Sequence, residues 1–267
     1  MSKVVGILNL TPDSFHDGGQ LQNWSLIQAK VESMVAAGVD IIDIGCESTN
    51  PKSNRITLEE EMSRLRPYLS KIRQLTTTSL AIDTYKTEVM AFAIDEGIDM
   101  INDQYALRSP GAIELVAKAN LPVCLMHFHG TLATMHEQPH FEDIMVELET
   151  FFTRRIEACL AHGIKSQHIV LDPGIGFSKT LEENLTVLRE VETLKTLGYP
   201  IYIGASRKRF IGKVLSLPDT DDRLIGSIAV AIKAWQTGVE YIRTHDVAET
   251  KQALEMMQAL TKIRTVV

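Results

Sequence analysis

Polar side chains end eight short apolar runs of this chain, and their types suit the binding of a polar ring and an anion. Acids and amides can pair with ring N–H groups or with a metal, whereas bases can hold phosphate or carboxylate. The acids and amides at these ends are Asn9, Asp43, Asp83, Asn102, Asp103 and Asp172, and the other polar ends are His127, Ser206, Arg207, Lys208, Arg243 and His245.

Each of these residues, taken alone, has a simpler explanation as a cap or turn residue. Asp, Asn and Ser are common where a strand leads into a helix, because their side chains bind nearby backbone groups. All eight runs, however, end in a hydrogen-bonding or ionisable group. The whole set therefore favours one functional site assembled from several strand ends.

Two segments add detail to this site. Asp172 is followed by Pro-Gly-Ile-Gly-Phe, whose glycines let the backbone approach a flat ligand, although an ordinary turn explains the segment equally well. Ser206 precedes three bases and can cap a following helix, whose N-terminus attracts an anion. Apolar residues flank the bases on both sides, which argues against a solvated charge run.

The apolar runs alternate with helical patterns, and near-continuous apolar runs are typical of strands buried on both faces. Eight strand–helix units predict a single-domain (β/α)₈ barrel over residues 1–267, with the active site at the C-terminal ends of the strands. A doubly wound sheet is the rival, but its G-x-G-x-x-G loop is absent. The expected strands are 4–9, 41–45, 80–83, 100–103, 123–127, 169–172, 201–206 and 241–245, and the expected helices are 25–37, 59–75, 88–97, 112–119, 141–162, 181–197, 223–238 and 248–263.

Composition excludes several function classes. Lys and Arg number 27 and Asp and Glu 34, and this net charge of −7 argues against a nucleic-acid or anionic-membrane binder. Three well-separated cysteines, Cys46, Cys124 and Cys159, fit free thiols in a reducing cytoplasm. The first residues lack the core of a signal peptide, and no apolar run is long enough to span a membrane.

The motifs together resemble those of the dihydropteroate synthase family. Each fragment alone is a weak signal, but the ordered set covers residues 6 to 247 and is highly specific. The matching segments are Gly6–Phe15, Asp17–Gly19, Asp43–Gly45, Glu47–Thr49, Pro51, Asp83–Lys86, Ile101–Asp103, Met126–His127, Asp172–Phe177, Ser206–Lys208 and Arg243–Val247.

The resemblance implies a pterin-binding barrel that condenses 6-hydroxymethyl-7,8-dihydropterin diphosphate with 4-aminobenzoate in folate biosynthesis, with Mg²⁺ as cofactor and a homodimer as the expected assembly. It further implies a role for each matching residue. Pterin would be bound by Asp83, Asn102, Asp172, Lys208 and Arg243; diphosphate by Asn9, Arg243 and His245, with Asn9 on Mg²⁺; and aminobenzoate by Thr49, Pro51, Phe177 and Ser206. The catalytic residues would be Asp83, Lys208, Arg243 and His245.

The second loop departs from the family pattern. Asn50 stands where the family has an Arg that grips diphosphate, and Cys46 and Lys52 replace glycines. We expect that the contact of this Arg with diphosphate is either absent here or supplied by Lys52 or Arg55. Two other functions stay open: a pterin-binding methyltransferase, which would need neither Mg²⁺ nor the Ser206 segment, and a non-catalytic pterin-binding paralogue.

Overall fold

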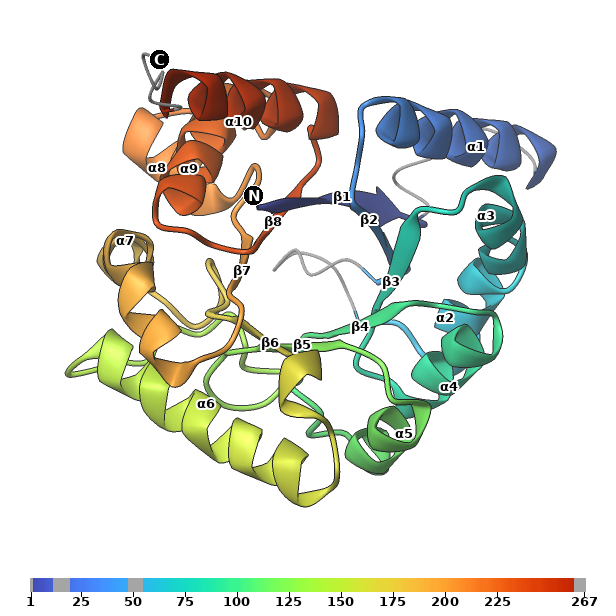
Figure 1. Ribbon diagram of the computed structural model, residues 1–267, viewed down its shortest axis with the longest axis horizontal. Coiled ribbons are helices and arrows are strands. Elements are labelled where there is room, and N and C mark those ends of the chain that lie inside the picture. The colour runs from blue at the N-terminus through green and yellow to red at the C-terminus, as the bar shows by residue number, and fades with distance from the viewer. Residues whose placement is uncertain (1, 12–19, 48–54, 262–267) are drawn as a thin grey trace, which may run out of the picture.

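The computed structural model describes residues 2–11, 20–47 and 55–261, and eight parallel strands form a barrel in it (Figure 1). Neighbouring strands pair in the order β6-β5-β4-β3-β2-β1-β8-β7, and a bridge between Leu171 and Ile201 joins the two ends of this order. The predicted barrel is therefore confirmed. The strands are β1 (Lys3–Asn9), β2 (Ile41–Gly45), β3 (Ser79–Asp83), β4 (Met100–Asp103), β5 (Val123–Met126), β6 (Ile169–Asp172), β7 (Tyr202–Gly204) and β8 (Tyr241–Thr244).

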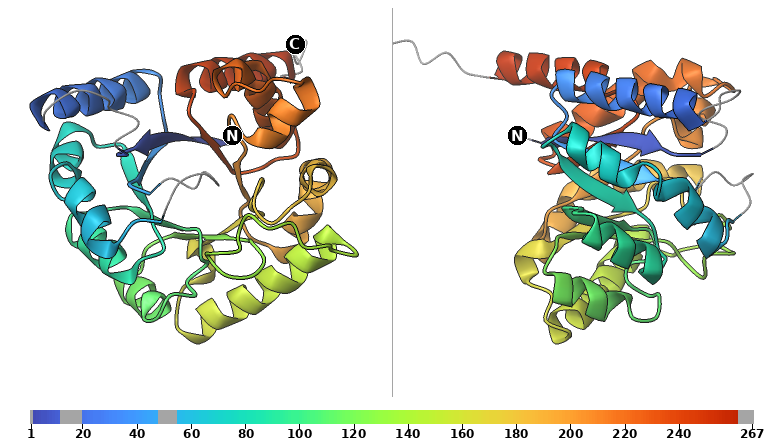
Figure 2. Two further views of the ribbon diagram at one scale, coloured as in Figure 1. Left: turned by 180° about the vertical axis from the view of Figure 1, so that it is seen from behind. Right: turned by 90° about the vertical axis from the view of Figure 1, so that its right-hand side faces the viewer.

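Helices surround the barrel on its outside (Figure 2). The α-helices of the described residues are α1 (Gln20–Ala36), α2 (Leu58–Leu65), α3 (Leu69–Leu75), α4 (Thr87–Asp95), α5 (Ala112–Ala119), α6 (Ile144–Ala161), α7 (Leu181–Glu190), α8 (Arg209–Leu215), α9 (Leu224–Gln236) and α10 (Val247–Thr261). Short 3₁₀ helices are η2 (Ser166–His168), η3 (Val191–Leu197) and η4 (Asp221–Arg223).

Three helical segments differ from the sequence expectation. The helix expected over residues 181–197 is α7 followed by the 3₁₀ helix η3. The helix expected over residues 59–75 is two helices, because Pro67 stands between α2 and α3 and has no N–H to continue the hydrogen-bond ladder. Helix α8 was not predicted, since its seven residues are too few for a clear periodic pattern.

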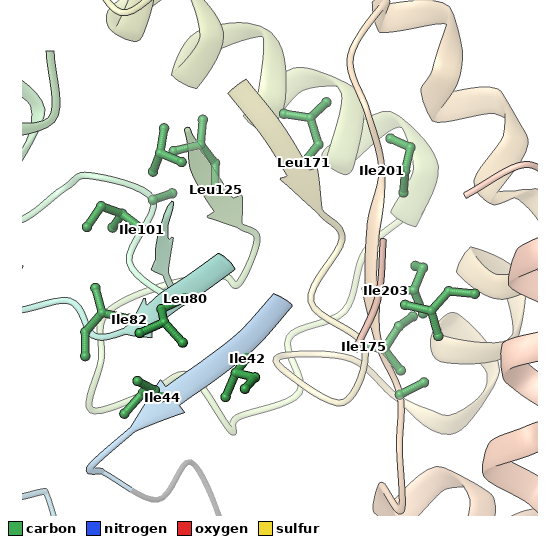
Figure 3. Close-up of a cluster of buried hydrophobic side chains, with 14 of the residues drawn as sticks. Ile42, Ile44, Leu80, Ile82, Ile101, Leu125, Leu171, Ile175, Ile201 and Ile203 are labelled. Carbon is green, nitrogen blue, oxygen red and sulfur yellow. The ribbon is translucent and has the colours of Figure 1, made fainter. Parts of the chain in front are cut away.

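Outward-facing strand residues form the main core. Ile42 and Ile44 of β2 and Leu80 and Ile82 of β3 are at most 1% exposed and belong to the cluster that the helices cover (Figure 3). Side chains alternate along a strand, so the residues between them face the interior of the barrel.

A second, separate cluster fills that interior and takes one apolar residue from each of β1 to β7, with Tyr241 of β8 packed against it. Two residues further along several of these strands, the inward position is polar. Ile41 is followed by Asp43, Ala81 by Asp83, Met100 by Asn102, Val170 by Asp172 and Tyr241 by Arg243. The alternation therefore places these polar side chains together at the C-terminal ends of the strands, next to the apolar cluster that fills the barrel interior.

Candidate active site

Arg243 lies between two carboxylates at the C-terminal ends of the strands. Its Nε donates to Oδ2 of Asp43 at 2.6 Å, and its Nη2 donates to Oδ2 of Asp83 at 2.7 Å. Nδ2 of Asn102 donates to the same Asp43 oxygen at 2.9 Å. Four predicted site residues from β2, β3, β4 and β8 are thus joined in one hydrogen-bonded network.

Burial and neighbouring charge oppose each other in this network. Burial raises the pKa of Asp83, the neighbouring charge of Arg243 opposes the rise, and Asp43 adds to it. Burial also lowers the pKa of Arg243, but Asp43 and Asp83 outweigh it and hold that pKa above its ordinary value. The guanidinium therefore stays charged and fixes one oxygen of each carboxylate.

Asp172 and Lys208 form a second acid–base group. Oδ1 of Asp172 accepts from the N–H of Gly174 at 2.8 Å, and Nζ of Lys208 donates to the carbonyl of Ile175. The ammonium lies 4.3 Å from the ring centroid of Phe177, a cation–π contact. Burial raises the pKa of Asp172 against the charge of Lys208, and burial lowers the pKa of Lys208 to about 8 against the charge of Asp172.

The loop after β6 needs glycine. Gly174 has φ +68°, and a Cβ there would overlap the carbonyl oxygen of His127. Gly176 has φ +85°, and a Cβ there would lie 3.1 Å from Cδ of Lys208. Only glycine combines these backbone angles with such close neighbours. The Pro-Gly-Ile-Gly segment therefore lets Lys208 pack against the loop that follows Asp172.

Lys179 supports this loop through hydrogen bonds to its carbonyls, a role that no sequence pattern indicated. Its Nζ donates to the carbonyls of Gly174 at 3.2 Å and Phe177 at 3.1 Å, and it lies 2.9 Å from Nδ1 of His127. Lys179 is only 3% exposed, and burial lowers its pKa to about 7. Burial and the charge of Lys179 lower the pKa of His127 to about 3, so this imidazole is neutral.

Ser206 and His245 form a third group at the ends of β7 and β8. The Ser206 hydroxyl accepts from the backbone N–H of His245 at 3.1 Å and lies 2.9 Å from Nδ1 of its ring. The prediction that Ser206 caps the next helix is wrong, because α8 begins at Arg209 with Lys208 as its N-cap. Burial and the nearby Arg243 lower the pKa of His245 to about 4, so its ring is neutral.

Asn9 faces the space above Gly45, its register partner on β2. A Cβ built on Gly45 would lie 3.7 Å from Oδ1 of Asn9 and 3.7 Å from Oδ2 of Asp83. No group of three or more His, Cys, Asp or Glu residues suited to a metal occurs in the described ranges. The donor set fits a hard cation that takes one protein oxygen here and its other ligands from phosphate and water.

Several polar strand ends lie outside this cluster. Asp103 accepts from the N–H groups of Tyr105 and Leu107 at 2.7 and 2.6 Å, as a turn residue does. Arg207 pairs with Asp246 at 2.6 Å and with Asp221 at 2.7 Å. Asp103 and His127 each follow an inward-facing residue. Because side chains alternate along a strand, both point away from the barrel interior.

Gln104 is a further site residue that was not predicted from the sequence. This residue is 5% exposed, and its Nε2 donates to Oδ1 of Asp83 at 2.6 Å. Gln104 stands two residues after Asn102 and four after Met100, so it continues the inward-facing series of β4 past the end of the strand. That spacing was the available signal.

The second loop is described only at its ends, because Thr49, Pro51, Asn50 and Lys52 lie outside the described residues. Arg55 donates to Oε1 of Glu47 at 2.8 Å and to the carbonyl of Leu132 at 3.1 Å. Its guanidinium is therefore engaged at the base of the loop. Lys86 donates to the other oxygen of Glu47 at 2.6 Å.

Across the described part of the chain, no helix has both the length and the apolar character needed to cross a membrane.

Residues 5–245 match the model of a family described as pterin binding enzyme. A dihydropteroate synthase of Haemophilus influenzae is 40% identical over 257 residues, which is 96% of this chain and 93% of that protein. The structure of Xanthomonas albilineans dihydropteroate synthase with 4-aminobenzoic acid has a TM-score of 0.92 and 38% identity, covering 98% of this chain and 94% of the other. The same enzyme in complex with 7,8-dihydropteroate has a TM-score of 0.89 and 37% identity, again covering 98% and 94%.

Proposed function

The chain belongs to the pterin-binding enzyme family, among its dihydropteroate synthases, and we propose that it condenses 6-hydroxymethyl-7,8-dihydropterin diphosphate with 4-aminobenzoate, releasing diphosphate. The observation that carries this proposal is the network of Asp43, Arg243 and Asp83 beside Asp172 and Lys208. It combines acceptors for ring N–H groups with fixed positive charge for a diphosphate.

The pterin is held by groups of both kinds. Asp172 accepts from the adjacent ring N–H and amino group, which one carboxylate can bind together. Asp83 and Asn102 bind further ring nitrogens, and Lys208 donates to the ring oxygen and nitrogen. Arg243 lies over the pterin face, and its fixed charge leaves it suited to an anion as well.

In the reaction, the amine nitrogen of aminobenzoate forms a bond to the pterin methylene carbon as the bond from that carbon to the diphosphate oxygen breaks. The amine loses a proton, and the bond electrons leave with diphosphate. The negative charge of Asp83 stabilises the cation that develops on the pterin, and Arg243 with His245 binds the departing diphosphate. All three residues are already fixed by hydrogen bonds, so little reorganisation accompanies the step.

Asn9 is the proposed protein ligand of Mg²⁺. Its single neutral oxygen fits a cation that arrives with the diphosphate rather than one that holds the fold. When bound, Mg²⁺ neutralises negative charge on the leaving diphosphate. Lys208 and Arg243 contribute further positive charge around the same substrate.

Phe177 packs against the aminobenzoate ring, and Ser206 takes part in binding its carboxylate. Phe177 is supported by its contact with Lys208 and by the loop carbonyls that Lys179 holds. The Ser206 hydroxyl is polarised by its contact with His245. Thr49 and Pro51, which complete the proposed aminobenzoate site, lie outside the described residues.

We also propose a homodimer in the cytoplasm. Exposed apolar side chains on α8 and α9, namely Val214, Leu215 and Ile225, are 52%, 47% and 77% exposed and support a protein contact on this side. The three cysteines are free and buried, which supports a reducing compartment.

Isothermal titration with pterin diphosphate and then aminobenzoate tests this function. We expect each to bind, with aminobenzoate binding only weakly when the pterin is absent. A product assay follows the titrations: a non-catalytic paralogue would bind pterin diphosphate without forming dihydropteroate, and a chain that binds neither substrate would contradict the proposal.

A further inference from the structure

Donors hold the Asp83 carboxylate from two sides. Nη2 of Arg243 donates to Oδ2 at 2.7 Å, and Nε2 of Gln104 donates to Oδ1 at 2.6 Å. Arg243 comes from β8, whereas Gln104 comes from the chain just after β4. Each oxygen of the carboxylate thus has one fixed partner, and the plane of the group is set from β8 and from the segment that follows β4.

The Gln104 amide leaves its own carbonyl unsatisfied. Oε1 is buried and accepts no hydrogen bond from any residue in the described ranges. A carboxylate only accepts, so the amide nitrogen must face Asp83, and this orientation points Oε1 away from it. A buried carbonyl without a partner is unfavourable for folding. The placement is therefore better explained by what Gln104 does to Asp83 than by stability.

Gln104 gives Asp83 a second held oxygen, whereas both donors of Asp43 bind its Oδ2 and leave its Oδ1 without a partner among the described residues. Asn102 donates to Asp43, Gln104 donates to Asp83, and Arg243 donates to both carboxylates. The two amides stand two residues apart in the inward-facing series of β4. Removal of the Gln104 amide would leave Asp83 held through Oδ2 alone, by Arg243, so its carboxylate would be free to rotate about its Cβ–Cγ bond.

We propose that Gln104 is a positioning residue that fixes the carboxylate plane of Asp83 and presents its remaining lone pairs to the bound pterin. This inference rests on the proposed function, because that function places the pterin against Asp83. Gln104 acts through Asp83, and its effect falls on the pterin rather than on aminobenzoate.

The test compares Gln104→Met with a matched control. Methionine keeps the length of the side chain and removes both the donor and the unsatisfied carbonyl. The control is Gln28→Met on α1, where the amide donates to Glu32 at 2.8 Å on the outside of the barrel. A second variant, Gln104→Glu, removes the donor and adds a like charge beside Asp83.

We expect Gln104→Met to weaken pterin binding in isothermal titration by roughly 10- to 100-fold, the scale of a hydrogen bond to a charged group. The kcat/KM for pterin diphosphate falls in proportion, the KM for aminobenzoate stays the same, and the Tm does not fall. Gln104→Glu loses at least as much pterin affinity, and Gln28→Met resembles the unmodified chain throughout.

Unchanged pterin affinity in both Gln104 variants would overturn the inference. A lower Tm with equal losses for both substrates would also overturn it, since that result indicates a structural role. Turnover is measured separately from pterin binding. If the chain binds pterin but shows no turnover, the proposed function is contradicted, and the titrations still test the role of Gln104. If the chain binds no pterin, both the proposed function and the role of Gln104 are overturned.

Discussion

At the scale of single residues, Asp172 offers the sharpest test of pterin recognition. One oxygen accepts from the N–H of Gly174 at 2.8 Å, and the other has no hydrogen-bond partner among the described residues. In Asp172→Asn the amide oxygen can keep the Gly174 contact, so the NH₂ group faces the donors of the pterin. We expect pterin affinity in isothermal titration to fall by about 2–4 kcal/mol, the scale of a mismatched buried charged pair. Unchanged affinity would show that Asp172 does not contact the ring.

The lowered pKa of Lys179 predicts that the free energy of unfolding depends on pH. Its pKa in the folded protein is about 7, against an ordinary value of 10.5, and burial is the main cause. Between these values the unfolded chain binds more protons at this site, so its contribution makes the free energy of unfolding rise with pH. The slope from this one group is at most about 1.4 kcal/mol per pH unit.

Urea unfolding of the ligand-free protein at pH 7, 8 and 9 measures this slope. Lys179→Gln keeps a donor for the loop carbonyls but removes the titration, so we expect a smaller rise with pH. Lys118→Gln, on the exposed face of α5, is the control for loss of one positive charge. Equal slopes in the unmodified chain and Lys179→Gln would contradict the assignment.

At the scale of elements, the loop between β6 and α7 depends on Gly174. Gly174→Ala adds both the strain of a positive φ and an overlap with the His127 carbonyl. Gly198→Ala is a matched control, because Gly198 has φ +81° and nothing within 4 Å of a built Cβ. The control should cost about 1–2 kcal/mol of unfolding free energy.

We expect Gly174→Ala to cost more, on the order of 3–5 kcal/mol, and to weaken pterin binding, because the loop carries Asp172 at its start. Urea unfolding and pterin titration of both variants measure the difference. If the two variants lose the same stability and both keep their pterin affinity, the loop does not depend on this close contact.

The barrel and most of its site could be predicted from the sequence, and the limits of that prediction have physical causes. The apolar runs identified the strands, because strands buried on both faces need apolar residues throughout. Polar types at strand ends identified Asp43, Asp83 and Arg243 but could not by themselves separate Asn102 from Asp103. That separation depends on strand register, which the side-chain alternation reveals once the strand bounds are known.

Other features depend on tertiary contacts that no local pattern contains. Lys179 supports the loop because its ammonium reaches two carbonyls and His127 from a different strand end. The Ser206 hydroxyl contacts His245 rather than the start of α8, because β7 and β8 are neighbours and α8 begins only at Arg209. Residue types indicate what a side chain can do, whereas its partner depends on the packing of the barrel.

At the scale of the whole molecule, the proposed dimer places Ile225 in an interface. Ile225 is 77% exposed near the start of α9, and its neighbour Gly226 packs closely against Ile211 of α8. A charge at position 225 would be costly to bury between subunits. We therefore expect Ile225→Glu to be a monomer where the unmodified chain is a dimer.

Size-exclusion chromatography with light scattering at several protein concentrations measures this mass. Leu26→Glu is the control, because Leu26 is 52% exposed on α1, on another part of the barrel surface. If Ile225→Glu remains a dimer, the interface does not include Ile225. If the unmodified chain is a monomer, the proposed dimer is wrong.

The most direct test of the central claim is a product assay on the purified chain. The protein is incubated with 6-hydroxymethyl-7,8-dihydropterin diphosphate, 4-aminobenzoate and Mg²⁺, and 7,8-dihydropteroate and diphosphate are quantified together. We predict equal amounts of both products, abolished by EDTA with little change in the Tm of the ligand-free protein, because Mg²⁺ assists diphosphate departure rather than folding. Pterin binding with no dihydropteroate formed, at any Mg²⁺ concentration, would contradict the account and indicate a non-catalytic pterin-binding protein.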